Sequence, residues 1–310
     1  YKVIFVSYGM DFILWWQTLP SKMDPTLLTI GSFQIYWYST MYLAAFGVVY
    51  LLCSRKIKNK TFTKINVAQL EDLLSWMLIG LLIGARLGYV LFYNLDHYLS
   101  NPLEILLPFS ISENGWEFTG ISGMSYHGGL IGVICAIWLY ARKINLHLFT
   151  LADFLTASIP LGFFWGRIGN FINGELYGRV TQSSLGMRFP QARFDNTKPW
   201  FDVNGDGLYS SIVDYQLRHP SQLYEAFFEG IILFLVINYF NRHNQLGFNS
   251  GLYVFGYGFF RFFIEFFREP DAHLGFIVFS LSMGQLLCIG MMMGGIFIWF
   301  TGYKLSKENI

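Results

Sequence analysis

The sequence predicts an all-α membrane protein with about seven transmembrane helices and a small extramembrane head. Three observations lead to this fold class. Of its 310 residues, 54% are hydrophobic and only 13% are charged, whereas soluble domains carry about 25% charged residues. Apolar stretches close to the ~20 residues that a helix needs to cross a bilayer recur along the chain. Lysines and arginines collect in alternate loops between these stretches.

Seven apolar stretches are predicted to span the membrane, and the fourth and sixth carry polar residues inside. They are residues 32–53, 70–93, 120–141, 150–172, 222–241, 250–268 and 277–303. The long loop before the fifth span keeps aromatic residues among its Gly, Asn and Asp, so it is predicted to fold as a head on the outer side. The predicted parts are an N-terminal extension or interfacial segment (1–22), spans one to four (23–173), the head (174–221), and spans five to seven with the tail (222–310).

The basic residues predict the orientation. Loop 54–69 contains five lysines and arginines, whereas loops 94–119 and 269–276 contain none. Short loops rich in Lys and Arg remain in the cytoplasm. This alternation predicts a periplasmic N-terminus and a cytoplasmic C-terminus. The net charge of +1 provides no basic surface, so no nucleic-acid partner is expected.

Four arginines lie within or at the ends of predicted spans: Arg86, Arg167, Arg261 and Arg268. At the bilayer centre each costs about 2.5–3.5 kcal/mol, so a function or a compensating partner is expected. Snorkelling to the interface is the alternative explanation, and it suits Arg268 better than Arg167 or Arg261. Glu265 lies four residues after Arg261 and three before Arg268, so all three side chains share one helix face. One carboxylate between two guanidiniums predicts a net positive face.

Polar residues also gather where the fourth span ends. The stretch Gly166–Gly178 contains four of them among several glycines, namely Arg167, Asn170, Asn173 and Glu175, and Arg179 follows directly. Glycines let helices approach closely or bend. Non-helical backbone at membrane depth has to face protein or a polar cavity. The sequence therefore predicts that these side chains line a functional cavity.

Two more groups are candidate site residues. His127 stands in Ser125–Gly129 at the outer start of the third span, where the flanking glycines are expected to leave it open to a cavity. On the second span, Arg86, Tyr89 and Tyr93 share one helix face. By contrast, Asp202–Gly207 matches only the first half of a calcium loop, because Val213 stands where the last acidic ligand belongs. An ordinary turn is the favoured interpretation there, and no metal site is predicted.

At these residues the chain resembles the prolipoprotein diacylglyceryl transferase family. The long signature is similar over Gly166–Gly178, with Arg167, Asn170, Asn173, Glu175 and Gly178 at matching positions. The other similar segments are Trp37-Tyr38, Gly84–Asn94, Ser125–Gly129, Arg218–Glu225 and Gly256–Asp271. The resemblance covers about residues 23–303, and the chain departs from the family before residue 23 and around 190–216.

The resemblance implies seven transmembrane helices in the bacterial inner membrane. It implies phosphatidylglycerol as the donor and the lipobox cysteine of a lipoprotein precursor as the acceptor. The products are a thioether-linked diacylglyceryl cysteine and glycerol phosphate. No cofactor and no metal are implied.

This chemistry suggests a role for each candidate. Arg167 and Arg261 are expected to grip the donor phosphate, because guanidinium binds phosphate in a bidentate manner and stays charged. A base has to take the thiol proton, and His127 is the first choice because imidazole titrates near neutrality. Glu175 is the alternative base, with Asn170 orienting groups by hydrogen bonds. Glu265 is expected to hold Arg261 and Arg268. The remaining predicted contacts to substrate are Tyr38, Arg86, Tyr89, Tyr93, Asn173 and Arg268.

Two other functions remain open from the residues alone. A transporter or lipid-flipping protein would use the same arginines to bind an anionic lipid reversibly. A scaffold would bind lipoprotein precursors without chemistry. Neither explains why His, Glu and two Asn accompany the arginines, and a transporter leaves the phospholipid intact.

Overall fold

The computed structural model describes residues 12–31, 33–105, 109–112, 115–118, 123–190, 216–241, 245–269, 276–278 and 281–308. The chain forms two compact units. Unit 1 contains residues 1–52 and 153–310, and unit 2 contains residues 53–152. The candidate residues divide between them.

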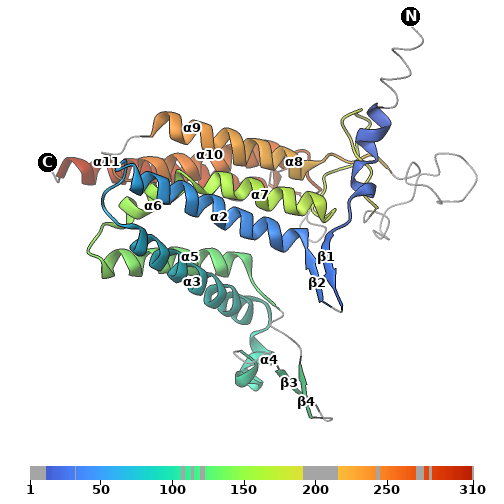
Figure 1. The fold of residues 1–310 in the computed structure, drawn as a ribbon, viewed down its shortest axis with the longest axis horizontal. Helices are drawn as coiled ribbons and strands as arrows, with labels where there is room; N and C mark the ends of the chain where they lie inside the picture. The colour runs from blue at the N-terminus through green and yellow to red at the C-terminus, as the bar shows by residue number, and fades with distance from the viewer. Residues whose placement is uncertain are drawn as a thin grey trace, which may run out of the picture. The chain divides into compact units, whose positions relative to one another are not determined.

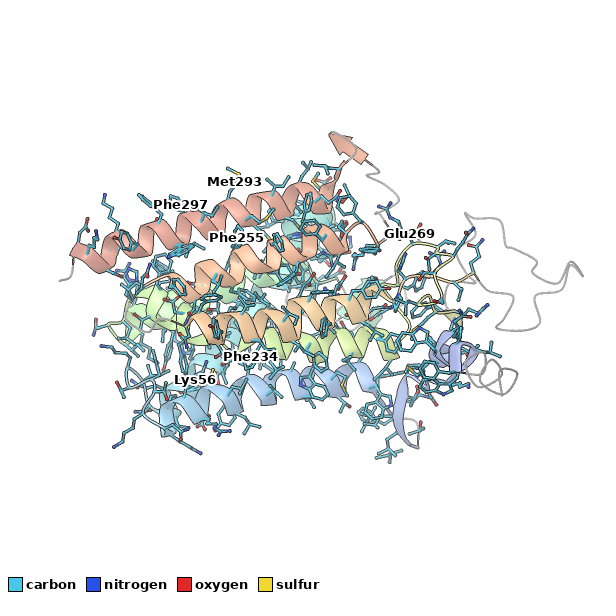
Figure 2. All side chains as sticks on the ribbon, turned by 90° about the horizontal axis from the view of Figure 1, so that it is seen from above. Lys56, Phe234, Phe255, Glu269, Met293 and Phe297 are labelled. Carbon is cyan, nitrogen blue, oxygen red and sulfur yellow. The ribbon has the colours of Figure 1, made fainter. Side chains whose placement is uncertain are left out.

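Unit 1 is built on long helices that run side by side (Figures 1 and 2). In chain order these elements are α2 (Trp37–Lys58), α7 (Ile159–Ile172), α8 (Ser221–Glu225), the π-helical segment η5 (Ala226–Ile232), α9 (Leu233–Phe240), α10 (Phe248–Ile264) and α11 (Met283–Glu308). Phe297 and Met293 point away from α11 in Figure 2 and are 70% and 66% exposed. Such apolar exposure suits a helix that faces lipid.

The predicted fourth span is a broken helix. It consists of α6 (Leu148–Thr156) and α7, which meet at an angle of 51°. Pro160 stands in the first turn of α7. Its ring would clash with the carbonyl group four residues earlier if one helix continued through, so the chain restarts there.

The described helices account for part of the predicted topology. Four helical segments are long and apolar enough to cross a membrane, and a fifth is added if the bent pair counts as one span. The four are α2, α3 (Val67–Tyr93), the continuous 221–240 helix and α11. Two predicted spans fall short among the described residues. The helix α5 (Tyr126–Lys143) has polar ends and only 18 residues, and α10 has 17.

The predicted first span begins too early. Residues 26–36 form an antiparallel hairpin of β1 (Thr26–Ile30) and β2 (Phe33–Tyr36), and α2 starts only at Trp37. Before the hairpin, residues 12–17 are helical and η1 (Leu19–Lys22) follows. Trp16 donates its indole N–H to the Leu185 carbonyl at 3.1 Å, and Arg188 donates to the Gln17 amide oxygen at 2.6 Å. Residues 12–22 therefore pack against the described part of the predicted head.

Unit 2 is held by close packing of α3 against α5. At Gly84 an added Cβ would overlap the Gly128 carbonyl oxygen and lie 2.7 Å from the Cα of Gly132. Only glycine permits this approach, as in other small-residue contacts between membrane helices. The same unit contains α4 (Leu95–Ser100), η2 (Pro102–Ile105) and the hairpin of β3 (Phe109–Ser112) and β4 (Gly115–Phe118).

Asp153 on α6 caps the start of α10. Its carboxylate accepts the Gly247 N–H at 2.7 Å, the Ser250 N–H at 2.8 Å and the Ser250 hydroxyl at 2.6 Å. These groups belong to the helix end whose N–H groups have no partner within the helix. The carboxylate thus fixes where α10 begins, and α10 carries Arg261.

Replacing Asp153 by alanine is expected to destabilise unit 1 by about 2 kcal/mol, the usual loss for hydrogen bonds to a charged group. Thermal unfolding of the detergent-solubilised protein, followed by tryptophan fluorescence, measures the fall in Tm. Asp72→Ala, which removes an exposed carboxylate on α3, is the control and should shift Tm far less. Equal Tm values for the two variants would contradict the capping role.

Candidate functional site

Arg167 and Asn170 form the first part of the site, one turn apart on α7. Arg167 donates from Nη1 to the Asn170 side-chain oxygen at 3.2 Å, and Asn170 donates from Nδ2 to Glu175 Oε1 at 2.8 Å. Glu175 can reach back because Gly174 adopts a left-handed conformation (φ 68°) directly after the helix. Three of the predicted site residues are therefore joined in one hydrogen-bonded chain.

The loop that follows is anchored to two distant segments. Gly178 donates its N–H to the His219 carbonyl at 2.8 Å, and Arg179 donates its N–H to the Phe267 carbonyl at 2.8 Å. A Cβ at Gly178 would overlap the Phe267 carbonyl oxygen and lie 2.9 Å from the His219 Cβ. A glycine is required here because three pieces of backbone meet. This contact brings the ends of α7 and α10 and the start of α8 together.

Glu225 is the centre of the site. Arg167 Nε lies 2.7 Å from Glu225 Oε2, Arg261 Nη1 lies 2.5 Å from Oε1, and Arg268 Nη1 lies 2.7 Å from Oε1. The contacts of Arg261 and Arg268 are hydrogen bonds, whereas Arg167 Nε meets the carboxylate as an ion pair without hydrogen-bond alignment. Helix α7, helix α10 and the turn after α10 thus each deliver one guanidinium to a carboxylate whose side chain is 0% exposed.

Glu265 is the second carboxylate of this group. Its Oε2 lies 3.2 Å from Arg261 Nη2 and 3.5 Å from Arg268 Nε, the two contacts that the helical spacing predicts. Ser282 donates its hydroxyl to Glu265 Oε1 at 3.3 Å. We call these five residues, Arg167, Glu225, Arg261, Glu265 and Arg268, the arginine–glutamate cluster.

The charged groups of this region are more numerous than the sequence predicts. The expected positive face assumed a single carboxylate, but Glu225 provides a second one in direct contact. Glu229, one helical turn further on, is also buried close to the arginines. Burial lowers the pKa of nearby His219, so this imidazole is neutral at pH 7. Arg167 adds a third guanidinium to match this second carboxylate, so without Glu229 the region keeps the single positive charge that the spacing of Arg261, Glu265 and Arg268 indicates.

Tyr38 and Asn173 lie at the edge of the same region. The Tyr38 hydroxyl is 3.0 Å from the Tyr42 hydroxyl and within hydrogen-bonding reach of the Asn170 side chain. Asn173 is the residue at which α7 ends, and its N–H donates to the Gly169 carbonyl at 3.0 Å. Unit 1 therefore gathers Tyr38 with the Arg167–Asn170–Glu175 chain.

The other candidate residues belong to unit 2. His127 stands in the first turn of α5 and is exposed, with its ring edge-on to Tyr126 at 5.7 Å. Ser125 caps this helix by accepting the Gly128 N–H at 3.2 Å. The imidazole is consequently held at a helix start, open to its surroundings.

Arg86 makes contacts that the sequence does not predict. Its guanidinium donates to the carbonyl oxygens of Ile105 at 2.9 Å and Gly123 at 3.3 Å, and also to that of Glu104. The guanidinium carbon lies 5.0 Å from the centre of the Tyr98 ring. These contacts favour a structural role for Arg86, which ties η2 to α3.

Tyr89 and Tyr93 stack on each other along α3, with ring centres 5.7 Å apart and an interplanar angle of 12°. Tyr89 also packs edge-on against Tyr98 at 6.4 Å. Tyr93 is 65% exposed. Of the two rings, Tyr93 is the one open to a lipid or substrate.

Glu225 and Glu229 are site residues that were not predicted from the sequence. Both lie inside an apolar stretch, four residues apart, and both are fully buried. A carboxylate at this depth is as anomalous as an arginine. Their i,i+4 spacing inside the predicted fifth span is the signal that identifies them.

Comparisons with known proteins find relatives over most of the chain. Residues 25–301 match the model of the family described as prolipoprotein diacylglyceryl transferase. A phosphatidylglycerol–prolipoprotein diacylglyceryl transferase of Chlorobaculum tepidum is 47% identical over 307 residues, covering 97% of this chain and 96% of the relative. Proteins with the same name are 46% identical in Bordetella bronchiseptica (92% of this chain, 98% of the relative) and 42% identical in Photorhabdus laumondii (93% and 96%).

Proposed function

This chain belongs to the prolipoprotein diacylglyceryl transferase family, and we propose that its arginine–glutamate cluster holds the phosphate of the donor lipid. As a transferase of this family, the protein moves the diacylglyceryl group of phosphatidylglycerol to prolipoprotein, the first step of lipoprotein maturation. The apolar helices suit a multi-pass membrane protein. The bilayer therefore supplies one substrate directly.

One observation carries the assignment of the site: three guanidiniums converge on Glu225 inside an apolar helical bundle. The donor carries its negative charge on a phosphodiester. Arginine recognises phosphate through two parallel N–H groups and keeps its charge when desolvated. Arg167 and Arg261 are each only 16% exposed, so most of the water that would screen their charge is excluded. Arg167 and Arg261 are assigned to the phosphate, with Glu225 fixing their orientation.

The reaction makes one bond and breaks one bond. The sulfur of the lipobox cysteine attacks the glycerol carbon that bears the phosphate. The C–S bond forms as the C–O bond breaks, and glycerol phosphate leaves with the electron pair. Negative charge builds up on the phosphate as it departs, and fixed cations in a dry site stabilise that charge.

The acceptor thiol needs a base, because its pKa near 8.5 leaves about a few per cent as thiolate at pH 7. We assign this role to His127, supported by its exposure at the start of α5 and by the chemistry of imidazole. Glu175 is the alternative, and its bond to Asn170 ties it to Arg167. Tyr38, Tyr93, Asn173 and Arg268 are assigned to the binding of substrate.

Replacing His127 by glutamine is expected to lower the single-turnover rate by about 10²-fold or more, the usual contribution of a general base. Glu175→Gln is the parallel measurement and should keep more of the wild-type rate. A near-normal rate for His127→Gln, together with a rate about 10²-fold lower in Glu175→Gln, would transfer the role to Glu175.

We also assign the topology in full: seven spans in the bacterial inner membrane, with the N-terminus periplasmic and the C-terminus cytoplasmic. The basic residues of loop 54–69 and the absence of Lys and Arg from loops 94–119 and 269–276 support it. Residues 174–221 then form a periplasmic head between the membrane parts 23–173 and 222–310, and residues 1–22 form an N-terminal extension or interfacial segment, of which residues 12–22 pack on the described part of the head.

The function is tested with the purified full chain in detergent. Phosphatidylglycerol and a lipobox peptide are added, and mass spectrometry follows the peptide while released glycerol phosphate is assayed. A gain of the diacylglyceryl mass together with glycerol phosphate is expected. Lipid that binds but stays intact, with an unmodified peptide in several detergents, would indicate a transporter or scaffold instead.

A further inference from the structure

Glu229 is a buried acid that the reaction described above does not use. Its side chain is fully buried. Neither carboxyl oxygen has a hydrogen-bond partner among the residues that the structure describes. An ionised carboxylate in such surroundings costs several kcal/mol unless it is paired and hydrogen-bonded. For a carboxyl group that is removed from water and accepts no hydrogen bond, burial of the neutral form costs less free energy than burial of the ionised form.

The position of Glu229 relative to the arginines is fixed by the backbone. It lies on η5, and single-turn π segments inside helices are frequent at functional sites. The next residue, Gly230, packs so tightly on α7 that an added Cβ would lie 2.8 Å from the Phe164 Cβ. Phe164 stands one turn before Arg167. Through this contact, the helical turn that contains Glu229 packs against α7 close to Arg167.

The charged and titratable groups around Glu229 come from several elements, including Cys288 on α11, on which Glu229 acts electrostatically. Arg167 comes from α7, Glu225 from α8, Arg261 from α10 and Arg268 from the segment after it, and each acts electrostatically on Glu229. Tyr257 on α10 lies within reach of Arg167 and Arg261. The adjoining helix α9 carries no charged residue. The ionisation state of Glu229 therefore depends on the charges of the arginine–glutamate cluster and in turn changes the net charge of this region.

Glu225 and Glu229 are the same residue type, one turn apart, with opposite surroundings. Glu225 contacts three guanidiniums, whereas Glu229 contacts none by a hydrogen bond or ion pair among the described residues. If Glu225 and Glu265 are ionised and Glu229 is neutral, three guanidiniums face two carboxylates. The cluster then keeps one positive charge. If Glu229 were also ionised, the cluster would be neutral and would have no excess charge for an anion.

We propose that Glu229 is a positioning residue that holds a proton in the resting protein, leaving the arginine–glutamate cluster with the single positive charge that one phosphodiester monoanion neutralises. The proposal rests on the proposed function only for the identity of that anion. Its consequence is a pH-dependent affinity for the donor. When Glu229 loses its proton, the cluster loses its excess charge, and the KM for phosphatidylglycerol rises by about tenfold, the effect of one charge at a distance of about 10 Å in a partly screened site.

The protonation is tested first, without any turnover. Infrared difference spectra of the purified full chain at pH 7, wild type minus Glu229→Gln, should show the carbonyl band of a neutral carboxylic acid. Wild type minus Glu225→Gln should show carboxylate bands instead. Glu229→Met, of similar volume and without an ionisable group, replaces the glutamine variant if that variant does not accumulate. Carboxylate bands in the Glu229 difference spectrum would overturn the proposal, whatever the protein catalyses.

The coupling to the donor is tested second, by measuring KM for phosphatidylglycerol against pH. In the wild-type protein KM should rise over the same pH range in which the carboxylic acid band disappears. In Glu229→Gln, whose amide stays neutral, that rise should be absent while kcat keeps its own pH dependence. A KM profile that is the same in both proteins would overturn the proposed charge coupling. Failure of every protein to modify the peptide would instead overturn the proposed function and leave the infrared result standing.

Discussion

Replacing Glu225 by glutamine is expected to lower kcat/KM by about 10²–10³-fold, the kinetic equivalent of breaking a buried ion pair. Glutamine has nearly the same shape but cannot neutralise three guanidiniums. Arg167, Arg261 and Arg268 would repel one another in a site from which most water is excluded, and each would have to find a new orientation. The phosphate would then meet a disordered set of donors.

The measurement is the steady-state rate of diacylglyceryl transfer together with the Tm of the same preparation. Glu308→Gln, an exposed glutamate at the end of α11, is the matched control and should behave like the wild-type protein. A fall in Tm without a fall in kcat/KM would make Glu225 a purely structural residue. Full activity with an unchanged Tm would contradict the geometry of the cluster.

Arg167→Ala is expected to lower kcat by about 10²–10³-fold, by analogy with the removal of one donor from an oxyanion hole. Arg167 faces two ways, because its Nε meets Glu225 at 2.7 Å and its Nη1 meets Asn170 at 3.2 Å. A lysine ammonium is a point charge without this fork. Arg167→Lys should therefore recover only part of the lost rate, although it restores the charge.

Single-turnover rates with saturating phosphatidylglycerol separate the two effects of this change. A lower rate at saturation means lost stabilisation of the departing phosphate, whereas a higher KM alone means lost binding of the donor. Arg142→Ala, at the far end of α5 and exposed, serves as the control. A lysine variant as active as the wild-type protein would show that charge alone is sufficient.

Much of the site can be predicted from charged residues that lie inside apolar spans. Arg167, Arg261, Glu265 and Arg268 stand out because each has a high cost in an apolar span, and the structure brings them together. Glu225 was not predicted, because the free-energy cost of a charged side chain in lipid was considered for the arginines and not for the acids of the predicted fifth span. The convergence of α7, α10 and the turn after α10 on Glu225 depends on tertiary packing, and helical spacing within one segment carries no information about that.

The fold follows from hydropathy only in part. Hydropathy locates α3 well, but it cannot distinguish an apolar strand from the start of a helix. The predicted first span therefore included β2, and the predicted seventh span (277–303) included strand residues before α11, which starts only at Met283. It also averages over Pro160, whose ring breaks the fourth span. Local backbone chemistry decides both features, and a window of ~19 residues is too long to detect it.

The convergence on Glu225 also has a consequence for biosynthesis. Arg167 leaves the ribosome well before Glu225, and Arg261 and Arg268 follow later still. At ~5–20 residues per second, the first arginine waits for roughly several seconds before its carboxylate exists. Helix α7 is therefore synthesised before the carboxylate that pairs with Arg167, and the last third of the chain supplies the ion pairs that complete this site.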